Sequence, residues 1–173
     1  MIFEEKFSVA PMMEWTDRHC RYFHRLLSGS AVLYTEMISA DALIFGPRHK
    51  LLAFNNEELP CVLQLGGNDP KKLSLAAKFG QSYGYSKINL NIGCPSNRVQ
   101  NGSFGACLMK TPKIVSECVR AMQDVSQVPI TIKCRIGVDD MDEVKGLDKF
   151  IDQVSTEGVK LFVIHARKAL LNG

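Results

Sequence analysis

Cys94 is the residue that the sequence best equips for chemistry. It follows the apolar segment 88–92, and the flanking Gly93 and Pro95 take the chain out of a regular strand, so we expect the thiol to project from a loop. A cysteine at an arbitrary position is more often a small buried hydrophobe, but the polar surroundings of this one favour a functional thiol. Because a thiol with a pKa of about 8.5 keeps its proton at neutral pH, the roles of nucleophile and general acid are both open.

Three more polar side chains stand near the ends of other apolar segments: Gln64, Lys133 and His165. A single glutamine or histidine in such a place is weak evidence for a functional site, since a buried residue with all its hydrogen bonds made explains it equally well. Lys133 has polar neighbours at strand spacing on both sides, and directed inward its fixed cation would suit an anionic ligand or an electron-rich ring. Together with Cys94, these residues are a stronger signal than any one of them.

Two neighbouring segments could complete such a site. Pro11, Met12 and Met13 offer a flat, polarizable surface suited to one side of an aromatic ring, although a pair of core methionines is an equally good interpretation. The glycine-rich, polar segment 99–106 follows Cys94 closely and is interpreted as a mobile active-site loop.

The elements that must position these residues repeat along the chain. Six short apolar, β-branched segments are predicted strands: 7–11, 31–36, 61–65, 88–92, 130–134 and 161–165. Between them, apolar residues three and four apart predict helices over 73–80, 114–122 and 147–154, with Pro70 and Pro112 near the first turns of two of them. The repeat of about 31 residues would give eight units in about 250 residues, the usual size of a (β/α)8 barrel.

Polar residues interrupt most of the six strand segments. Parallel strands covered on both faces normally form unbroken runs of valine, isoleucine and leucine, whereas a barrel builds its active-site mouth from polar strand ends. A Rossmann-type sheet would carry a G-x-G-x-x-G turn, and the nearest match, at Gly66 and Gly67, lacks that spacing. The sequence therefore predicts a TIM (β/α)8-type barrel with about six of its eight β/α units, rather than an open doubly wound sheet.

Composition excludes several classes of protein. With 173 residues, 46% hydrophobic and 23% charged, the chain resembles ordinary globular domains and neither disordered nor collagen-like ones. No apolar run approaches the roughly 20 residues of a membrane span, and Glu4 and Glu5 stand where a signal peptide needs cations, so we expect a cytoplasmic protein. Six cysteines without a C-x-x-C pair and four histidines without an H-x-x-x-H pair predict no metal site, and the net charge of +3 permits an RNA partner without indicating one.

Several motifs resemble those of the tRNA-dihydrouridine synthases, flavin enzymes with a (β/α)8 barrel. The matching stretches are Ala10-Pro-Met-Met, Gln64-Leu-Gly-Gly, Asn89-Leu-Asn-Ile-Gly-Cys-Pro, Lys133-Cys-Arg-Ile-Gly and His165-Ala-Arg-Lys. The segments 96–105 and 165–173 are most similar to the A-type bacterial subfamily, which modifies uridines 20 and 20a of the tRNA D-loop.

The resemblance implies a role for each matching residue. Pro11, Met12, Met13, Gln64, Lys133 and His165 would contact FMN, with NADPH as the reductant. Cys94 would donate a proton to the uracil ring, and Asn91 would lie beside the substrate base. Arg98, Arg18 and Arg21 are candidates for contacts with tRNA phosphates at the rim.

The sequence also departs from the family pattern. Asn97 stands where the family has aspartate, and the two further barrel strands and the C-terminal helical tRNA-binding domain are not among these 173 residues. We therefore expect residues 1–173 to be the N-terminal part of an FMN-binding barrel, with exposed sheet edges that favour self-association or poor FMN binding. Two alternatives stay open, namely a flavin barrel that reduces a free pyrimidine, as dihydroorotate dehydrogenases do, and an inactive fragment.

Overall fold

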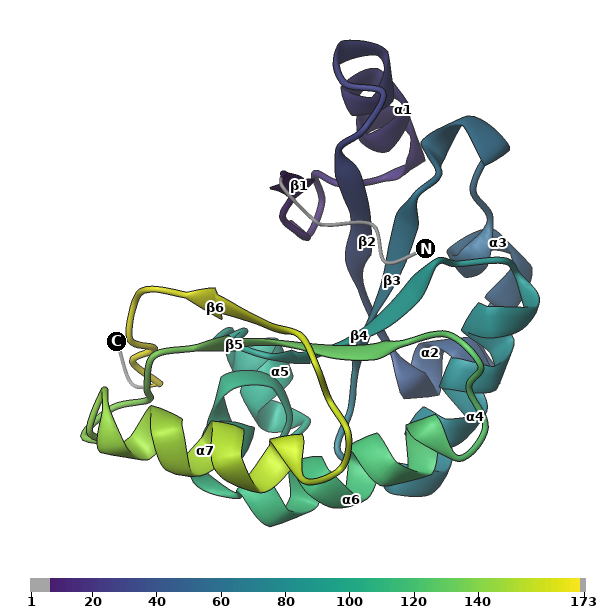
Figure 1. Cartoon of the computed structure of the whole chain (residues 1–173). Coiled ribbons are helices and arrows are strands. Elements are labelled where there is room, and N and C mark those ends of the chain that lie inside the picture. Colours follow the sequence, from purple (N-terminus) through teal and green to yellow (C-terminus); the bar gives the residue numbers. More distant parts are fainter. Residues whose placement is uncertain (1–6, 172–173) are drawn as a thin grey trace.

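The computed structural model describes residues 7–171, in which six parallel strands form one sheet in the order β1-β2-β3-β4-β5-β6. Figure 1 shows the sheet curling from β1 to β6 without closing. The strands are β1 (Ser8–Val9), β2 (Val32–Ser39), β3 (Cys61–Gly66), β4 (Lys87–Ile92), β5 (Ile130–Arg135) and β6 (Phe162–His165). All six predicted strands are confirmed, and the architecture is that of six β/α units of a (β/α)8-type barrel.

Nine helical segments connect these strands within the described range. They are α1 (Arg18–Leu27), α2 (Ala40–Phe45), α3 (Arg48–Leu52), the 3-10 turn η1 (Asn56–Glu58), α4 (Pro70–Ser82), α5 (Asn97–Asn101), the 3-10 turn η2 (Gly105–Lys110), α6 (Pro112–Gln123) and α7 (Lys145–Ser155). None of the helices between residues 7 and 171 is both long and apolar enough to cross a membrane.

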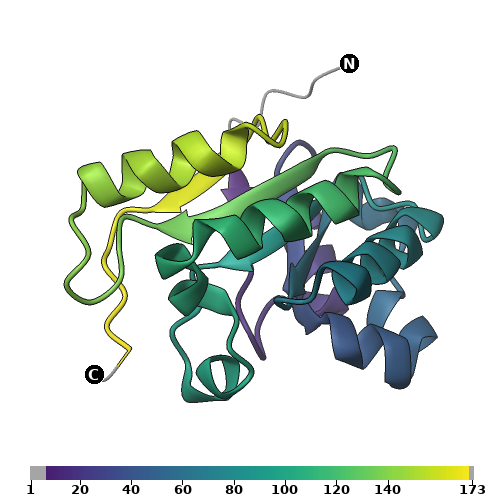
Figure 2. The ribbon, with the colours of Figure 1, turned by 90° about the horizontal axis from the view of Figure 1, so that it is seen from below.

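The main hydrophobic core lies between the outer face of the sheet and the helices. Leu63, Leu90 and Ile132 point outward from neighbouring strands and are completely buried. They pack against the apolar faces of α4, α6 and α7, which cross that side of the sheet in Figure 2. At Gly80 of α4 an added Cβ would lie 2.4 Å from Cδ2 of Leu63, so a larger residue there would force the leucine side chain to move.

The alternate residues of the same strands are polar and lie on the inner face of the sheet. Gln64, Asn89 and Thr131 lie opposite one another across β3, β4 and β5, and all three are buried. Since residues one position away pack into the helix-covered core, the strand parity inferred for Lys133 is confirmed. The curled sheet therefore keeps apolar side chains outside and places polar ones on its concave side.

An irregularity in β2 brings additional residues into this polar face. The register of β2 on β3 shifts between Tyr34 and Met37, so that Met37 lies opposite Gln64. Thr35 lies within the shift, and its Oγ1 accepts the backbone N–H of Gln64 at 3.0 Å. This bulge also extends the strand to Ser39, beyond its predicted end at residue 36.

The predicted starts of two helices are confirmed, but one predicted loop is wrong. Asp69 caps α4 by accepting the N–H groups of Lys71 and Lys72, and Pro70 and Pro112 open α4 and α6. The segment 99–106, interpreted as a mobile loop, instead runs from the helix α5 into the turn η2. The buried side chain of Val99 explains the difference, because it anchors the short helix to the core in spite of its polar neighbours.

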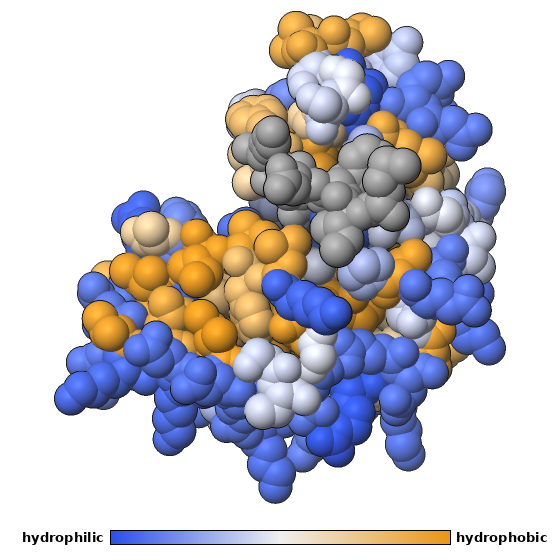
Figure 3. Space-filling view, in the orientation of Figure 1, coloured by the Kyte–Doolittle hydropathy of each residue, from blue (hydrophilic) through white to orange (hydrophobic). Residues whose placement is uncertain are grey.

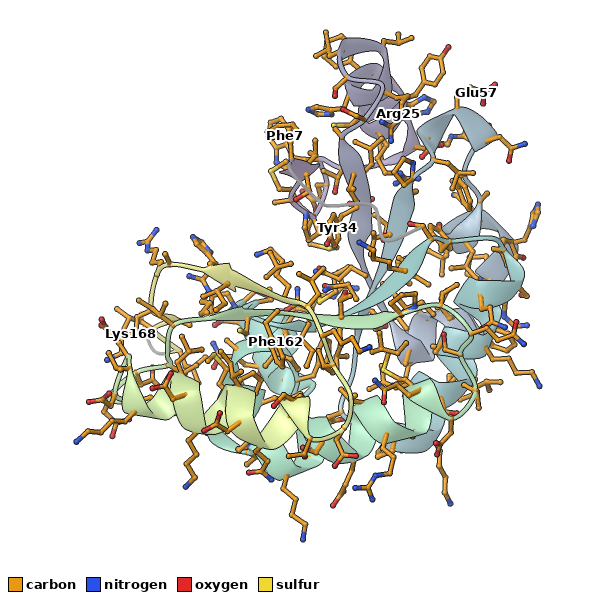
Figure 4. The ribbon with its side chains drawn as sticks, in the orientation of Figure 1. Phe7, Arg25, Tyr34, Glu57, Phe162 and Lys168 are labelled. Carbon is orange, nitrogen blue, oxygen red and sulfur yellow. The ribbon has the colours of Figure 1, made fainter. Side chains whose placement is uncertain are left out.

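The helix α1 was not predicted from the sequence. Asp17 caps it by accepting the N–H of Cys20, and Arg21 projects from it into a buried ion pair with Glu58 of η1, at 2.6 Å. Arg25 adds a bond from Nη2 to the carbonyl oxygen of Glu58, and Figure 4 shows it beside the turn that also carries Glu57. Charged residues thus fasten α1 to the start of β3 where an apolar seam would usually do so.

Candidate functional site

A hollow of about 530 Å³ lies at the carboxyl ends of β3 to β6, on the concave side of the sheet. Eight of the residues that the sequence singled out line it: Pro11, Met13, Gln64, Asn91, Cys94, Arg98, Lys133 and His165. They come from four strand ends, the segment after β1 and the loop after β4, so the fold assembles the site from distant parts of the chain. Strand ends meet in this way at the mouth of a (β/α)8 barrel.

The loop that carries Cys94 is held by hydrogen bonds on both sides. The side-chain oxygen of Asn91 accepts the backbone N–H groups of Gly93 and Cys94, at 3.0 and 2.9 Å. The carbonyl oxygen of Cys94 accepts the N–H of Ala106 at 2.9 Å. Gly105 has a φ of +75°, and a Cβ there would lie 2.6 Å from that same carbonyl oxygen, so this position requires glycine. Cys94 is half-buried, and the backbone that carries its side chain is held in place.

Arg135 fastens the same loop from the neighbouring strand. Its Nε donates to the carbonyl oxygen of Gly93 at 2.7 Å, and its Nη1 reaches the carbonyl oxygen of Lys168 at 3.4 Å. The guanidinium therefore joins the loops that follow β4 and β6 across the end of β5. It also lines the hollow, which places a positive charge close to Cys94.

Positive charge gathers on the wall formed by β5 and β6. Burial, followed by the nearby Arg135, lowers the pKa of Lys133. His165 is exposed, but partial desolvation, followed by the cations Arg135, Lys133 and Arg167, lowers its pKa. Within residues 7–171, no carboxylate forms an ion pair with any of these four side chains. Mutual repulsion without a counter-ion makes this wall a site for an anionic or electron-rich group.

The side chain of Gln64 is held by hydrogen bonds at both ends of its amide. Its Oε1 accepts from Asn91 Nδ2 at 2.9 Å, and its Nε2 donates to Asn89 Oδ1 at 2.8 Å. Only 1% of the residue is exposed, although it contributes to the lining. Its amide therefore has a fixed orientation towards any ligand.

Three other predicted residues have different surroundings. Met12 lies outside the lining of the hollow, and its backbone N–H donates to Thr16 Oγ1. Arg18 lies on an adjoining hollow of about 700 Å³. Arg21, a candidate for a phosphate contact, also lines that hollow, but its guanidinium is buried against Glu58 and the carbonyl oxygen of Thr16, which disfavours such a contact. The two hollows share Met13, Met37, Cys94, Ser96 and Arg98, so the thiol stands where they meet.

Sequence reasoning missed some residues of the site. Met37 enters the lining through the bulge in β2, which no sequence pattern marked. Glu14 also lines the hollow, and it lies in a turn after β1 with a φ of +63°. Arg135 could have been found, since it has the same strand parity as Lys133. No group of three histidine, cysteine or acidic side chains within residues 7–171 is arranged to hold a metal ion.

The arrangement combines a thiol, an oriented carboxamide and a cationic wall around one hollow. Such a set can hold a flat, carbonyl-rich ring against the wall and present the thiol to a second group beside it. The adjoining hollow supplies the space for that second group.

The chain is similar to known proteins over nearly all of its length. The family described as dihydrouridine synthase (Dus) matches residues 8–172. Among curated proteins, the chain is 57% identical over 169 residues to the tRNA-dihydrouridine(20/20a) synthase of Vibrio cholerae serotype O1, covering 97% of this chain and 51% of that protein. It is 56% identical over 168 residues to the protein of the same name in Xanthomonas axonopodis pv. citri, covering 97% and 50% of the two chains.

The protein of the same name in Escherichia coli K12 is 56% identical over 169 residues, covering 97% of this chain and 49% of its own. The chain thus spans about half the length of the curated relatives it matches. Because the family match extends over nearly all of the sequence, the chain belongs to the dihydrouridine synthase family.

Proposed function

We propose that residues 1–173 form the N-terminal part of the FMN-binding catalytic barrel of a cytoplasmic tRNA-dihydrouridine synthase. The reaction is reduction of the C5=C6 bond of uridine at positions 20 and 20a of the tRNA D-loop, with NADPH as the reductant. The observation that carries the proposal is the convergence of Gln64, Cys94, Lys133 and His165, from four separate β/α units, on one hollow. The names of the relatives support the choice of tRNA as substrate.

The residues around the hollow suit FMN. Lys133 is a half-buried cation without a hydrogen-bond or ion-pair partner within residues 7–171, and burial, followed by the nearby Arg135, lowers its pKa. An electron-rich ring edge placed against it would relieve the cost of burying the charge. Gln64 would hold the same ring by its oriented amide, His165 would stand at its edge, and Pro11 and Met13 would cover one side.

Cys94 would be the proton donor. When bound, reduced FMN supplies the hydride that adds to C6 of uracil. The thiol of Cys94 gives its proton to C5, which completes the saturated ring and leaves a thiolate that solvent protonates again. Asn91 would keep the thiol in place, because its amide oxygen binds the N–H of Cys94.

The substrate would enter through the adjoining hollow. A uridine must leave its stack to reach the thiol, and Cys94 is shared by the two hollows. Arg98 lines both, and Arg18 lines the adjoining one, so these two arginines are suited to the phosphates on either side of the flipped nucleotide.

One experiment separates this function from its alternatives. The complete protein is purified, its flavin is measured by absorbance, and the flavin is reduced with NADPH. Reoxidation by unmodified tRNA, and not by free uracil or orotate, is the expected result. Reoxidation by a free pyrimidine would instead indicate the other class of flavin barrel, and a colourless protein that takes up no FMN would indicate an inactive fragment.

A further inference from the structure

Four side chains on the inner face of the sheet form one continuous line of hydrogen bonds, which we call the amide relay. It runs from Asn91 through Gln64 and Asn89 to Thr131, with donor–acceptor distances of 2.9, 2.8 and 2.9 Å. Gln64, Asn89 and Thr131 are at most 2% exposed and lie directly opposite one another on β3, β4 and β5. Asn89 and Thr131 do not line the hollow, whereas Gln64 and Asn91 do.

The direction of the amide relay is fixed at its two ends by the backbone. The N–H groups of Gly93 and Cys94 can only donate, so the group of Asn91 that faces them must be its oxygen. The nitrogen of Asn91 then points to Gln64, which must accept with its oxygen. Backbone groups therefore determine which atom of each side-chain amide is the oxygen and which is the nitrogen.

The other end of the relay requires the same direction. Gln64 donates through Nε2 to the oxygen of Asn89, and Asn89 donates through Nδ2 to Thr131 Oγ1. The hydroxyl of Thr131 then donates to the carbonyl oxygen of Ile88, which can only accept, at 3.4 Å. Both ends require the same direction, so only one orientation of the side-chain amides makes all the hydrogen bonds of the relay.

This orientation decides what the hollow offers a ligand. Asn91 Nδ2 and Gln64 Nε2 each keep a second N–H that has no acceptor among residues 7–171. A ring edge with carbonyl oxygens can accept these hydrogen atoms, whereas an edge with amino groups would face two donors with donors of its own.

We propose that Asn89 and Thr131 are positioning residues that, acting through Gln64, hold two N–H donors towards the hollow and so select a pyrimidine ring edge that bears carbonyl oxygens. Naming the ring rests on the proposed function, because uracil and the pyrimidine part of FMN both have such an edge. The residues themselves touch neither ring.

The first test needs no ligand. Exchange of the side-chain amide protons of Gln64 is measured by NMR in the wild type and in Asn89→Leu, Asn89→Asp and Thr131→Val. Leucine at position 89 leaves Gln64 without its acceptor, so exchange at Gln64 should rise by roughly 3- to 10-fold, and Thr131→Val should raise it in the same direction. Ile132→Val, on the same strand as Thr131 but facing the helices, is the matched control and should leave it unchanged.

Asn89→Asp separates positioning from packing. An aspartate at position 89 can accept from Gln64 Nε2 in either protonation state, so the bond that orients Gln64 keeps its direction. When it is ionised, the aspartate also accepts from the Thr131 hydroxyl, so only the last bond of the relay changes direction. The proposal therefore predicts slow exchange at Gln64 in Asn89→Asp and fast exchange in Asn89→Leu. A site that only needed packing would rank the variants in reverse, because an apolar residue is cheaper to bury than a carboxylate. If Asn89→Leu fails to fold, Thr131→Val, which keeps the shape of the side chain, carries the same comparison.

The second test assigns the ring. Affinities are measured for FMN against 2-thio-FMN and 4-thio-FMN, and for tRNA with uridine against 4-thiouridine at the target position, because sulfur accepts hydrogen bonds weakly. In the wild type the oxygen form should bind roughly 3- to 10-fold more tightly in one of these pairs, and Thr131→Val and Asn89→Leu should narrow that ratio while Asn89→Asp keeps it. The pair that responds identifies the ring held by the relay.

Unchanged exchange at Gln64 in both Asn89→Leu and Thr131→Val would overturn the proposal. Ratios of affinity between the oxygen and sulfur forms that no variant alters would also overturn it. A wild-type protein that binds neither FMN nor tRNA would overturn the proposed function and the selection of a ring, while the effect on Gln64 exchange is read without either ligand.

Discussion

Arg135 is bonded to the backbone of Gly93, with its Nε 2.7 Å from the carbonyl oxygen, immediately before the cysteine that the site depends on. The amide oxygen of Asn91 binds the N–H groups on either side of that carbonyl. The loop is thus held through both kinds of backbone group, by side chains from two neighbouring strands. Such double restraint suits a thiol that must meet a substrate atom in one direction.

Replacing Lys133 by methionine tests the cationic wall. The substitution keeps the volume of the side chain and removes the charge, so FMN should bind more weakly and become harder to reduce. Fluorescence titration gives the affinity, and an equilibrium with a reference dye gives the reduction potential. Lys145→Met on α7 is a matched control outside the lining of the hollow. Wild-type affinity and potential in Lys133→Met would show that this lysine does not contact the flavin.

The lowered pKa of His165 predicts a dependence of stability on pH. The folded protein binds a proton at this residue less readily than the unfolded chain, whose histidine has a pKa of about 6.5. The stabilisation is therefore complete above about pH 6.5 and is lost as the pH falls from there towards the folded pKa. Urea unfolding at pH 7.5 and 5.5 should show a smaller loss of stability in His165→Gln than in the wild type. Equal losses would mean that neither desolvation nor the neighbouring cations lower the pKa of His165 in the folded protein.

The Arg21–Glu58 pair should matter far more for stability than an exposed pair of the same kind. Arg21→Met leaves the fully buried Glu58 without its counter-ion, and we expect a cost of about 3–5 kcal/mol in the free energy of unfolding. Arg120→Met breaks the more exposed pair with Glu157 and should cost at most about 1 kcal/mol. Chemical denaturation of both variants makes the comparison, and similar costs would contradict the structural role of the buried pair.

Much of the fold could be predicted from the sequence, because the strand segments combine an apolar outer face with polar inner residues. Gln64, Lys133 and His165 were found because they are polar side chains near the ends of apolar strand segments, and all three line the hollow. The helix α1 was missed although its apolar residues Tyr22, Phe23, Leu26 and Leu27 lie three and four positions apart. The buried role of Arg21 could not be found, since an ion pair between distant segments leaves no periodic pattern. The segment 99–106 was misassigned because one buried valine outweighs its polar composition.

The open sheet predicts the solution behaviour of these 173 residues. β1 and β6 each pair on one side only, and Figure 3 shows apolar surface along β6, where Ile164 is exposed. Unpaired edges beside apolar surface promote association, so the isolated chain should self-associate or carry little FMN. Light scattering and flavin absorbance on one sample check this. Ile164→Lys should reduce association more than Phe45→Lys on α2, and a fully flavinated monomer of 19.3 kDa would contradict the prediction.

The most direct test of the account is Cys94→Ala in the complete, flavin-loaded protein. NADPH should reduce the flavin at the wild-type rate, because the thiol plays no part in that step. Reoxidation by unmodified tRNA, followed by stopped-flow absorbance, should slow by about 10²- to 10⁴-fold, the usual effect of losing a positioned general acid. Cys118→Ala, on the buried face of α6, controls for loss of a thiol and should leave both steps unchanged. Reduction of tRNA by Cys94→Ala at the wild-type rate would contradict the assignment of Cys94 as the proton donor.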